Sequence, residues 1–388
     1  MINTYTLFTS EVDLLDATIA DINKQLAEIP LQKNSVGILI CHYDFVEYGI
    51  VSALRESLPF PLVGITTFYQ TTPKTSGLFE LTITILTSDD VRFALACSAA
   101  ADEHISPKEK IQDTYRNAFD IYGTSPALVL SFISANRPVS GDEYLRHLDD
   151  ISGGIPSFGV VNSGEDETGA NIYIISEGHS FSDGIAMLLL IGELHAKMYT
   201  SQPLEDRLLS ISAAVTSADG VIIKEINQQS AATYLKKNGV NFDDINEGIV
   251  TSVPFYCRMP GDEKFVCRLL KSILPNGALE FMAEIPEGTQ LRIGTVTADD
   301  ILEESCDVLQ KAVNENPDAS IFFIASCVGR FITLGLDTTA EMDHVAKTLQ
   351  ADKNHLACYV GGEICPIQKN GQWVNRYHNN SFIVLALH

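Results

Sequence analysis

The polar residues best suited to binding a small molecule lie in three short stretches near the end of the chain. Each stretch adjoins an apolar run typical of a strand, so groups that could reach a ligand lie at predicted strand edges. The adjacent glycines 361 and 362 would let a ligand or another backbone approach Glu363. A plain hairpin with polar residues facing water is the alternative. The candidate ligand-binding residues are Ser326, Cys327, Arg330, Gly362, Glu363, His378, Asn379 and Asn380.

Arg330 directly follows an apolar predicted strand. Because a buried charge without a partner costs several kcal/mol, this guanidinium needs an anion nearby. One interpretation is a bidentate clamp on a ligand carboxylate, which the planar guanidinium fits. The other is a structural ion pair with Glu363 or with an aspartate of the same domain. Glu363 would bind a ligand ammonium in the first case and Arg330 in the second.

His378 and the two asparagines that follow it allow several interpretations. His378 could donate to a ligand, bind a haem iron, or form an ordinary hydrogen bond at a strand edge. Asn379 and Asn380 are residue types common in turns, so a purely structural role also explains them.

The enzymatic alternative is a thiol hydrolase that uses Cys327 as nucleophile and His378 as base, with Asn380 or Glu363 orienting the imidazole. Apolar neighbours raise a thiol pKa, and no helix is predicted to start close behind Cys327, so both features count against it. The eight cysteines include no Cys-x-x-Cys pair, which predicts reduced thiols. Cys257 and Cys267 are expected to react fastest, because charged residues flank them.

Other common sites of chemistry have no signature, since phosphate-binding glycine motifs, EF-hand loops and zinc knuckles are absent from the sequence. We therefore expect no cofactor. The formal charge of −24 and the pI near 4.6 disfavour nucleic acid and anionic membranes as partners. The start of the chain lacks a secretory signal, and its most apolar run, residues 185–191, is too short to span a bilayer. These features predict a cytoplasmic protein.

The predicted elements recur in a similar order three times, beginning near residues 36, 127 and 321. Each unit reads as strand, helix, strand and further strands across turns, although chance recurrence would explain so common a unit. Pro203, in a polar stretch, marks the predicted boundary between domains at residues 1–202 and 203–388. We predict an α/β (α+β) fold of mixed parallel and antiparallel sheets covered by helices.

Several stretches of the second half resemble the FIST family, which is named for F-box and intracellular signal-transduction proteins. The turn from Ser326 to Arg330 is similar to the family's Ser-Cys-x-x-Arg turn. The resemblance covers nearly the whole chain as an N-terminal and a C-terminal FIST region. The other matching stretches are residues 219–227, 284–289 with 299–301, 361–364 and 378–381.

This resemblance implies a sensory module, not an enzyme, that binds a small ligand such as an amino acid or a related small carboxylate. Some relatives are described as haem-based nitric-oxide sensors, so a haem-based gas sensor is a further alternative. The FIST pair fills the chain and leaves no output domain. Signalling would then pass through a partner protein supplied in trans.

Overall fold

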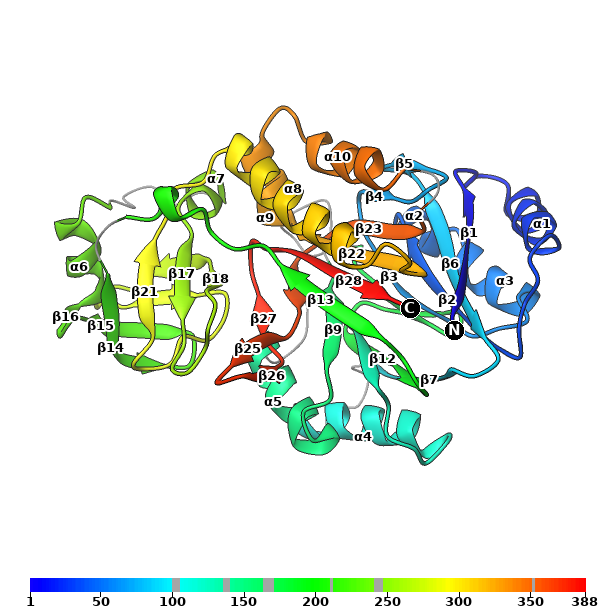
Figure 1. The fold of residues 1–388 in the computed structure, drawn as a ribbon, viewed down its shortest axis with the longest axis horizontal. Coiled ribbons are helices and arrows are strands. Elements are labelled where there is room, and N and C mark those ends of the chain that lie inside the picture. Colours follow the sequence, from blue (N-terminus) through cyan, green and yellow to red (C-terminus); the bar gives the residue numbers. More distant parts are fainter. Residues whose placement is uncertain (100–104, 135–139, 163–170, 210–211, 241–246, 351–352) are drawn as a thin grey trace.

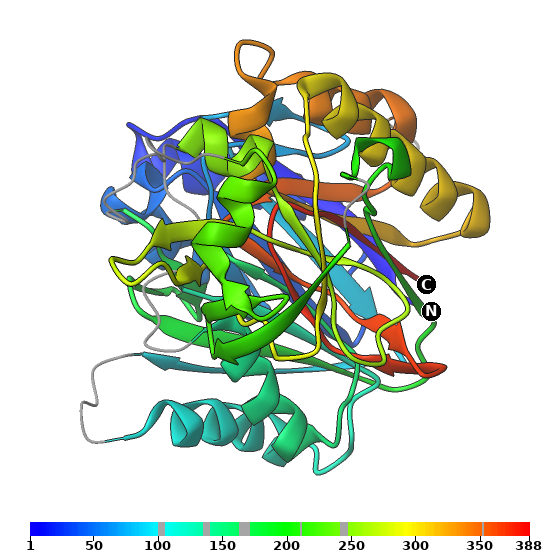
Figure 2. The same ribbon diagram turned by 90° about the vertical axis from the view of Figure 1, so that its left-hand side faces the viewer.

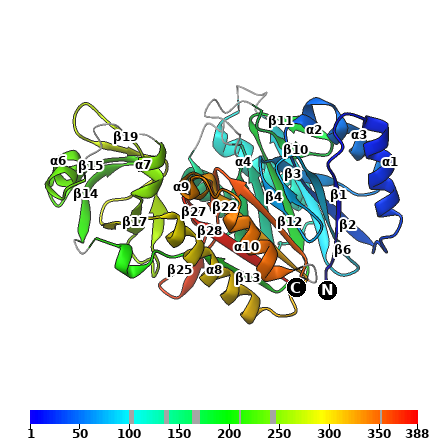
Figure 3. The same ribbon diagram turned by 90° about the horizontal axis from the view of Figure 1, so that it is seen from above.

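The computed structural model describes the whole chain except residues 100–104, 135–139, 163–170, 210–211, 241–246 and 351–352. Three mixed sheets with covering helices form its body, and residues 201–297, here called the inserted region, extend to one side (Figure 1). The inserted region is nearest the viewer in Figure 2. The two termini lie beside each other in all three views (Figures 1 to 3).

The first sheet has the strand order β1-β6-β2-β3-β10-β11, and only β2 and β3 are parallel. Its helices α1 and α3 pack their apolar side on one face. The elements of this first unit are β1 (Asn3–Thr9), α1 (Leu15–Leu26), β2 (Asn34–Cys41), α2 (Asp44–Glu47), α3 (Ile50–Ser57), β3 (Leu62–Thr66), β4 (Gln70–Thr71), β5 (Ser76–Gly77) and β6 (Leu81–Ser88).

The second sheet repeats this arrangement in the order β7-β12-β8-β9-β24-β27, with β8 and β9 parallel. Helices α4 and α5 cover it. The elements of the second unit are β7 (Arg92–Ala99), α4 (Pro107–Asp120), β8 (Leu128–Ile133), α5 (Gly141–Ser152), β9 (Ser157–Val161), β10 (Ile174–Ser176), β11 (His179–Phe181) and β12 (Gly184–Ile191).

The third sheet has the order β13-β28-β22-β23-β4-β5, with β22 and β23 parallel, and α8 and α10 cover it. Its unit also supplies the small β25–β26 hairpin. The elements are β13 (Ala196–Thr200), α8 (Ala298–Glu315), β22 (Ile321–Cys327), α9 (Val328–Leu334), α10 (Ala340–Leu349), β23 (His355–Val360), β24 (Gly362–Ile364), β25 (Ile367–Lys369), β26 (Gln372–Val374), β27 (Tyr377–His378) and β28 (Phe382–Leu387).

Each unit gives two strands that precede its final strand to the sheet of a neighbour. The pair β10–β11 of the second unit completes the first sheet, β24 and β27 of the third unit complete the second, and β4–β5 of the first unit complete the third. The three sheets are therefore linked in a closed cycle by strand exchange.

Strand alternation gives each sheet two apolar faces. Alternate residues such as Ile38, Leu130 and Phe323 meet in one central core shared by all three sheets. The residues between them face outward and form a separate core under the helices of each unit. The cavity left at the centre is only about 40 Å³ and apolar, so the middle of the body is packed.

The inserted region has its own antiparallel sheet and its own core. Near residues 250 and 267 it packs on α8 and α9 through a smaller apolar cluster. Its elements are η1 (Glu205–Arg207), β14 (Ala213–Asp219), β15 (Ile222–Ile226), β16 (Gln229–Ser230), α6 (Ala231–Lys237), α7 (Glu247–Ser252), β17 (Phe255–Arg258), β18 (Val266–Arg268), β19 (Leu270–Ile273), β20 (Leu279–Phe281) and β21 (Gln290–Ile293).

The predicted fold class is confirmed, because helices cover mixed sheets built from three repeated units. The boundary between residues 202 and 203 stays a prediction. Strands from both sides of it share the second and third sheets, since β9 pairs with β24 and β13 pairs with β28.

Candidate functional site

The turn after β22 places Ser326 and Cys327 in different surroundings. Cys327 ends the strand and stands directly before α9, so the prediction that no helix starts close behind it is wrong. Because successive residues of a strand face opposite sides, Ser326 and Cys327 separate. Ser326 Oγ donates to Glu341 Oε2 on α10 at 2.5 Å, whereas Cys327 interacts with Glu363 of the second sheet.

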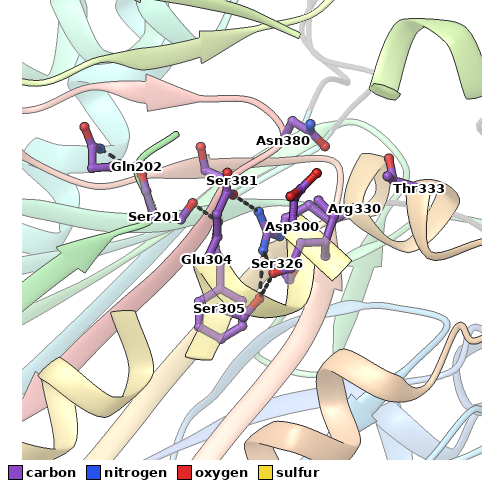
Figure 4. A network of polar contacts seen from close by, with 12 residues as sticks. Ser201, Gln202, Asp300, Glu304, Ser305, Ser326, Arg330, Thr333, Asn380 and Ser381 are labelled. Carbon is purple, nitrogen blue, oxygen red and sulfur yellow. Dashed lines mark hydrogen bonds and ion pairs between the residues drawn. The ribbon is translucent and has the colours of Figure 1, made fainter. Parts of the chain in front are cut away.

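Arg330, on α9, lies fully buried among α8, α9 and α10 (Figure 4). Its Nη1 donates to Glu304 Oε2 at 2.9 Å, and its Nε and Nη2 donate to Glu341 Oε1 at 3.0 and 2.9 Å. Nη2 also donates to the Ile301 carbonyl and to Ser305 Oγ, both at 2.7 Å. The guanidinium is therefore held by two glutamates and by the buried face of α8.

This network decides between the two interpretations of Arg330 only in part. The ion pairs are with Glu304 and Glu341, so the predicted structural pairing with Glu363 or an aspartate is wrong in its partners. Burial raises the pKa of Glu304, and Arg330 opposes that rise. One cation therefore already faces two carboxyl groups of the protein itself.

Glu363 lies on β24, directly opposite His378 on the antiparallel strand β27. It is fully buried, and its Oε2 accepts a hydrogen bond from the Ser381 amide at 3.3 Å. Burial raises the pKa of Glu363 well above its usual range, and the Cys327 thiol and the Ser381 amide partly offset this rise. The sequence thus brings Cys327, Glu363 and the segment from His378 to Ser381 together, as expected.

Three buried oxygen atoms, on Glu363 and on the two asparagines that follow His378, have no donor among the described residues. They are Glu363 Oε1, Asn379 Oδ1 and Asn380 Oδ1, each on a residue with no more than 5% of its surface exposed. Asn380 is in the left-handed region at φ 50°, and its Nδ2 donates to the Thr251 carbonyl at 3.3 Å. A Cβ atom on Gly329 would stand 2.8 Å from Asn380 Oδ1, so the amide of Asn380 lies close against the start of α9. We call Glu363, Asn379 and Asn380 the acceptor cluster.

His378 is buried, and its Nε2 lies 2.8 Å from the carbonyl oxygen of Cys365. A carbonyl oxygen can only accept, so Nε2 carries the proton. Burial lowers the pKa of His378 to about 3, and Arg268 and Arg376 add to this effect. The imidazole is therefore neutral at physiological pH and bound to the backbone.

The cysteines differ in exposure in a way that the flanking residues did not predict. Cys257 and Cys267 are buried, and burial raises the pKa of each thiol, so the expectation that they react fastest is wrong. Cys97 and Cys306 are the partly exposed ones. Burial and the neighbouring Glu363 raise the pKa of Cys327 well above its usual range, which disfavours a thiolate there.

A cleft of about 610 Å³ lies between α5, the inserted region and the β25–β26 hairpin. Below it, the fully buried Arg268 donates to Asp142 Oδ1 of α5 at 3.0 Å and to the Tyr377 carbonyl at 2.8 Å. This cleft could not be predicted from the sequence, because its walls come from distant segments. Its lining residues are Asp142, Leu145, Arg146, Asp149, Ala218, Gly220, Met259, Pro260, Glu284, Ile285, Pro286, Glu287, Lys369, Asn375 and Arg376.

Metal-binding clusters and membrane-spanning helices are both absent from the described part of the chain. No group of three or more His, Cys, Asp or Glu side chains is arranged to hold a metal ion there. None of the helices in that part combines the length and the apolar character needed to span a membrane.

The raised pKa of Glu363 predicts a dependence of stability on pH. An acid whose pKa is raised by folding stabilises the folded state below its ordinary pKa of 4.5, and this contribution is lost as pH rises through the folded value. We expect the melting temperature of the wild-type protein to fall relative to that of Glu363→Gln as the pH is raised above about 4.5. Parallel melting curves for the two proteins between pH 4.5 and 8 would contradict this.

Comparison with known proteins gave the following matches. Residues 35–229 match the FIST N domain and residues 229–366 match the FIST C domain. No curated protein matches the chain. Among solved structures, a cyanuric acid hydrolase from A. caulinodans is similar with 9% sequence identity and a TM-score of 0.36, over 100% of this chain and 99% of that one. A second cyanuric acid hydrolase structure matches over 100% of both chains, with 9% identity and a TM-score of 0.34.

Proposed function

This chain belongs to the FIST family, and from that premise we propose that it is a sensory protein that binds a small amine-bearing ligand at the acceptor cluster. FIST domains are sensory domains associated with signal transduction. The proposed ligand class includes amino acids. A partner protein would carry the signal onward, and the protein would act in the cytoplasm.

The observation that carries this proposal is the set of three buried oxygens without a donor. Leaving a buried acceptor unsatisfied costs about 1–3 kcal/mol, so three such atoms, on Glu363 and on two adjacent asparagines, favour a ligand that donates hydrogen bonds. A primary ammonium has three donors and no acceptor. Its positive charge would also stabilise the ionised form of Glu363, which burial disfavours in the protein alone.

We propose that a carboxylate clamp by Arg330 is not part of this site. The Arg330 guanidinium already binds two glutamates, a carbonyl and a hydroxyl. The ligand is then recognised through its amine, and Ser326, which donates to Glu341, belongs with Arg330 in the supporting structure.

We also propose that the protein is neither a thiol hydrolase nor a haem sensor. The Cys327 thiol has a raised pKa, and His378, the proposed base, has its Nε2 bonded to the Cys365 carbonyl. A haem iron bound at the same Nε2 would displace that hydrogen bond. The absorption spectrum of protein made in haem-replete cells tests the haem alternative, and a Soret band lost in His378→Ala would support it.

The ligand class is tested by thermal unfolding with the twenty standard amino acids and simple primary amines, each beside its analogue without the amine. At a concentration of 100 times Kd, a ligand of the folded state adds about 2.7 kcal/mol of stability. We expect at least one amine-bearing compound to stabilise the wild-type protein, and its amine-free analogue to have no effect. Glu363→Gln should lose the stabilisation, because it removes the carboxylate while keeping the shape.

Glu304→Gln is the matched control, because Glu304 is also a buried glutamate with a raised pKa but lies in the Arg330 network. It should keep the response to the ligand. Calorimetry in buffers of different ionisation enthalpy gives a second readout, since binding of an ammonium should release the proton of Glu363. An amine that stabilises Glu363→Gln as much as the wild type, or no response to any amine, would refute the proposal.

A further inference from the structure

A second pocket, of about 530 Å³, lies beside the β25–β26 hairpin, of which Gln368 and Trp373 line it. Its walls come from β13, the exposed side of α8, the segment before β18 and the hairpin itself. Figure 3 shows β13, α8 and β25 next to one another at the lower edge of the molecule. The lining residues are Pro156, Ala196, Lys197, Met198, Tyr199, Glu263, Lys264, Lys311, Glu315, Pro366, Gln368 and Trp373.

Three lysines from three separate segments, Lys197, Lys264 and Lys311, line this pocket in a protein whose formal charge is −24. Among the described residues, none of the three forms an ion pair with a carboxylate; Lys197 contacts only the carbonyl of Glu315, at 3.5 Å. Such a concentration of unpaired positive charge in an acidic protein favours an anionic ligand.

Two glutamates also line the pocket, and each carboxylate accepts a hydrogen bond from a neutral donor. Glu263 Oε1 accepts a hydrogen bond from the Gly371 amide at 2.8 Å, and Glu315 Oε2 accepts one from the Tyr199 hydroxyl at 2.9 Å. Burial and the charge of Lys311 lower the pKa of Lys264. The two ammonium groups therefore repel each other in the unliganded protein, and an anion between them would relieve that repulsion.

Trp373 supplies a flat apolar surface on the same pocket. It is the only tryptophan of the chain, and 54% of it is exposed. Met198, Pro156 and Pro366 add apolar surface to the lining. An exposed indole beside cationic groups suits a ligand that has both a planar ring and a negative charge, because stacking and charge pairing then act together.

We infer that this pocket, here called the lysine–tryptophan pocket, binds a phosphorylated nucleoside or a similar planar ring that bears an anionic group. The ring stacks on Trp373, and the phosphate lies between Lys264 and Lys311. The inference does not depend on the acceptor cluster, since no residue is shared. The pocket volume lies within the range of small-molecule sites.

The single tryptophan makes this inference directly testable by fluorescence. Titration with adenosine monophosphate should quench the emission of Trp373 with saturation, because stacking of the base changes the surroundings of the indole. Adenosine should quench the emission of Trp373 only at higher concentration. Inorganic phosphate should compete with adenosine monophosphate without quenching the emission. Added salt should weaken the binding of adenosine monophosphate more than the binding of adenosine.

The double variant Lys264→Gln/Lys311→Gln should bind the monophosphate at least about tenfold more weakly, as expected for lost charge-assisted contacts. Lys236→Gln/Lys237→Gln on α6 removes the same charge far from the pocket and should bind normally. Glu363→Gln should also bind normally, which separates this site from the acceptor cluster. Absence of saturable quenching, or an equal loss in both double variants, would overturn the inference.

Discussion

Arg330→Met is expected to lower the free energy of unfolding of the ligand-free protein by about 3–5 kcal/mol. Methionine keeps much of the apolar volume but removes every donor. Glu304 and Glu341 would then face each other in a buried site without a cation, and the Ile301 carbonyl would lose its partner. Urea unfolding followed by far-ultraviolet circular dichroism measures the change.

Two further variants separate this explanation from loss of packing. Glu341→Gln in the Arg330→Met background removes one unpaired buried charge and should restore part of the lost stability. If lost packing were the cause, Glu341→Gln would restore none of it. Glu304→Gln alone should cost less than Arg330→Met, because Arg330 still pairs with Glu341. If Arg330→Met kept full stability but lost its response to the amine ligand, Arg330 would belong to the binding site after all.

The second large effect is expected at Arg268, which joins the inserted region to the second unit. Arg268→Met should lower the free energy of unfolding by about 3–5 kcal/mol. The substitution leaves Asp142 without its ion-pair partner and three carbonyl oxygens without their donor. These carbonyls belong to Cys267, Glu284 and Tyr377. Hydrogen exchange should then become faster in α5 and β27, the two elements that Arg268 connects to β18.

Arg258→Met is the matched control for Arg268→Met. Arg258 also lies on the inserted sheet, but its guanidinium binds Gln290 of the neighbouring strand β21, within the same region. Loss of the Arg258 guanidinium should leave the free energy of unfolding nearly unchanged, and hydrogen exchange in α5 should also stay unchanged. Equal destabilisation by the two variants would show that Arg268 acts through packing rather than through the contact with Asp142.

The repeated units could be predicted from the sequence because each strand and helix has a local apolar pattern. The exchange of strands could not. The pairing of Gln70 with Cys358 joins the first unit to the third, and nothing in either segment specifies the other. Helix α9 was also missed, since its seven residues begin with valine and glycine and are too few to show a helical period.

The sequence predicted that three segments lie together at the candidate site, because each segment has polar residues at the edge of a predicted strand. The partners of Arg330 were not predicted. Glu304 lies between Ile301 and Val308 on the buried stripe of α8, and a carboxylate within an apolar stripe was the available signal. Which buried cation it meets depends on how α9 packs, and that is a tertiary property.

The exchange of strands also constrains how the protein is made. On the ribosome, which releases about 5–20 residues per second, the chain emerges from its N-terminus. The edge of β9 has no partner until Gly362–Ile364 has been synthesised, and β13 has none until Phe382–Leu387 follows. Unpaired strand edges invite association with other chains. A nascent chain, or one truncated before residue 362, therefore leaves β9, β13 and β22 with open edges, which β24 and β28 close in the folded protein.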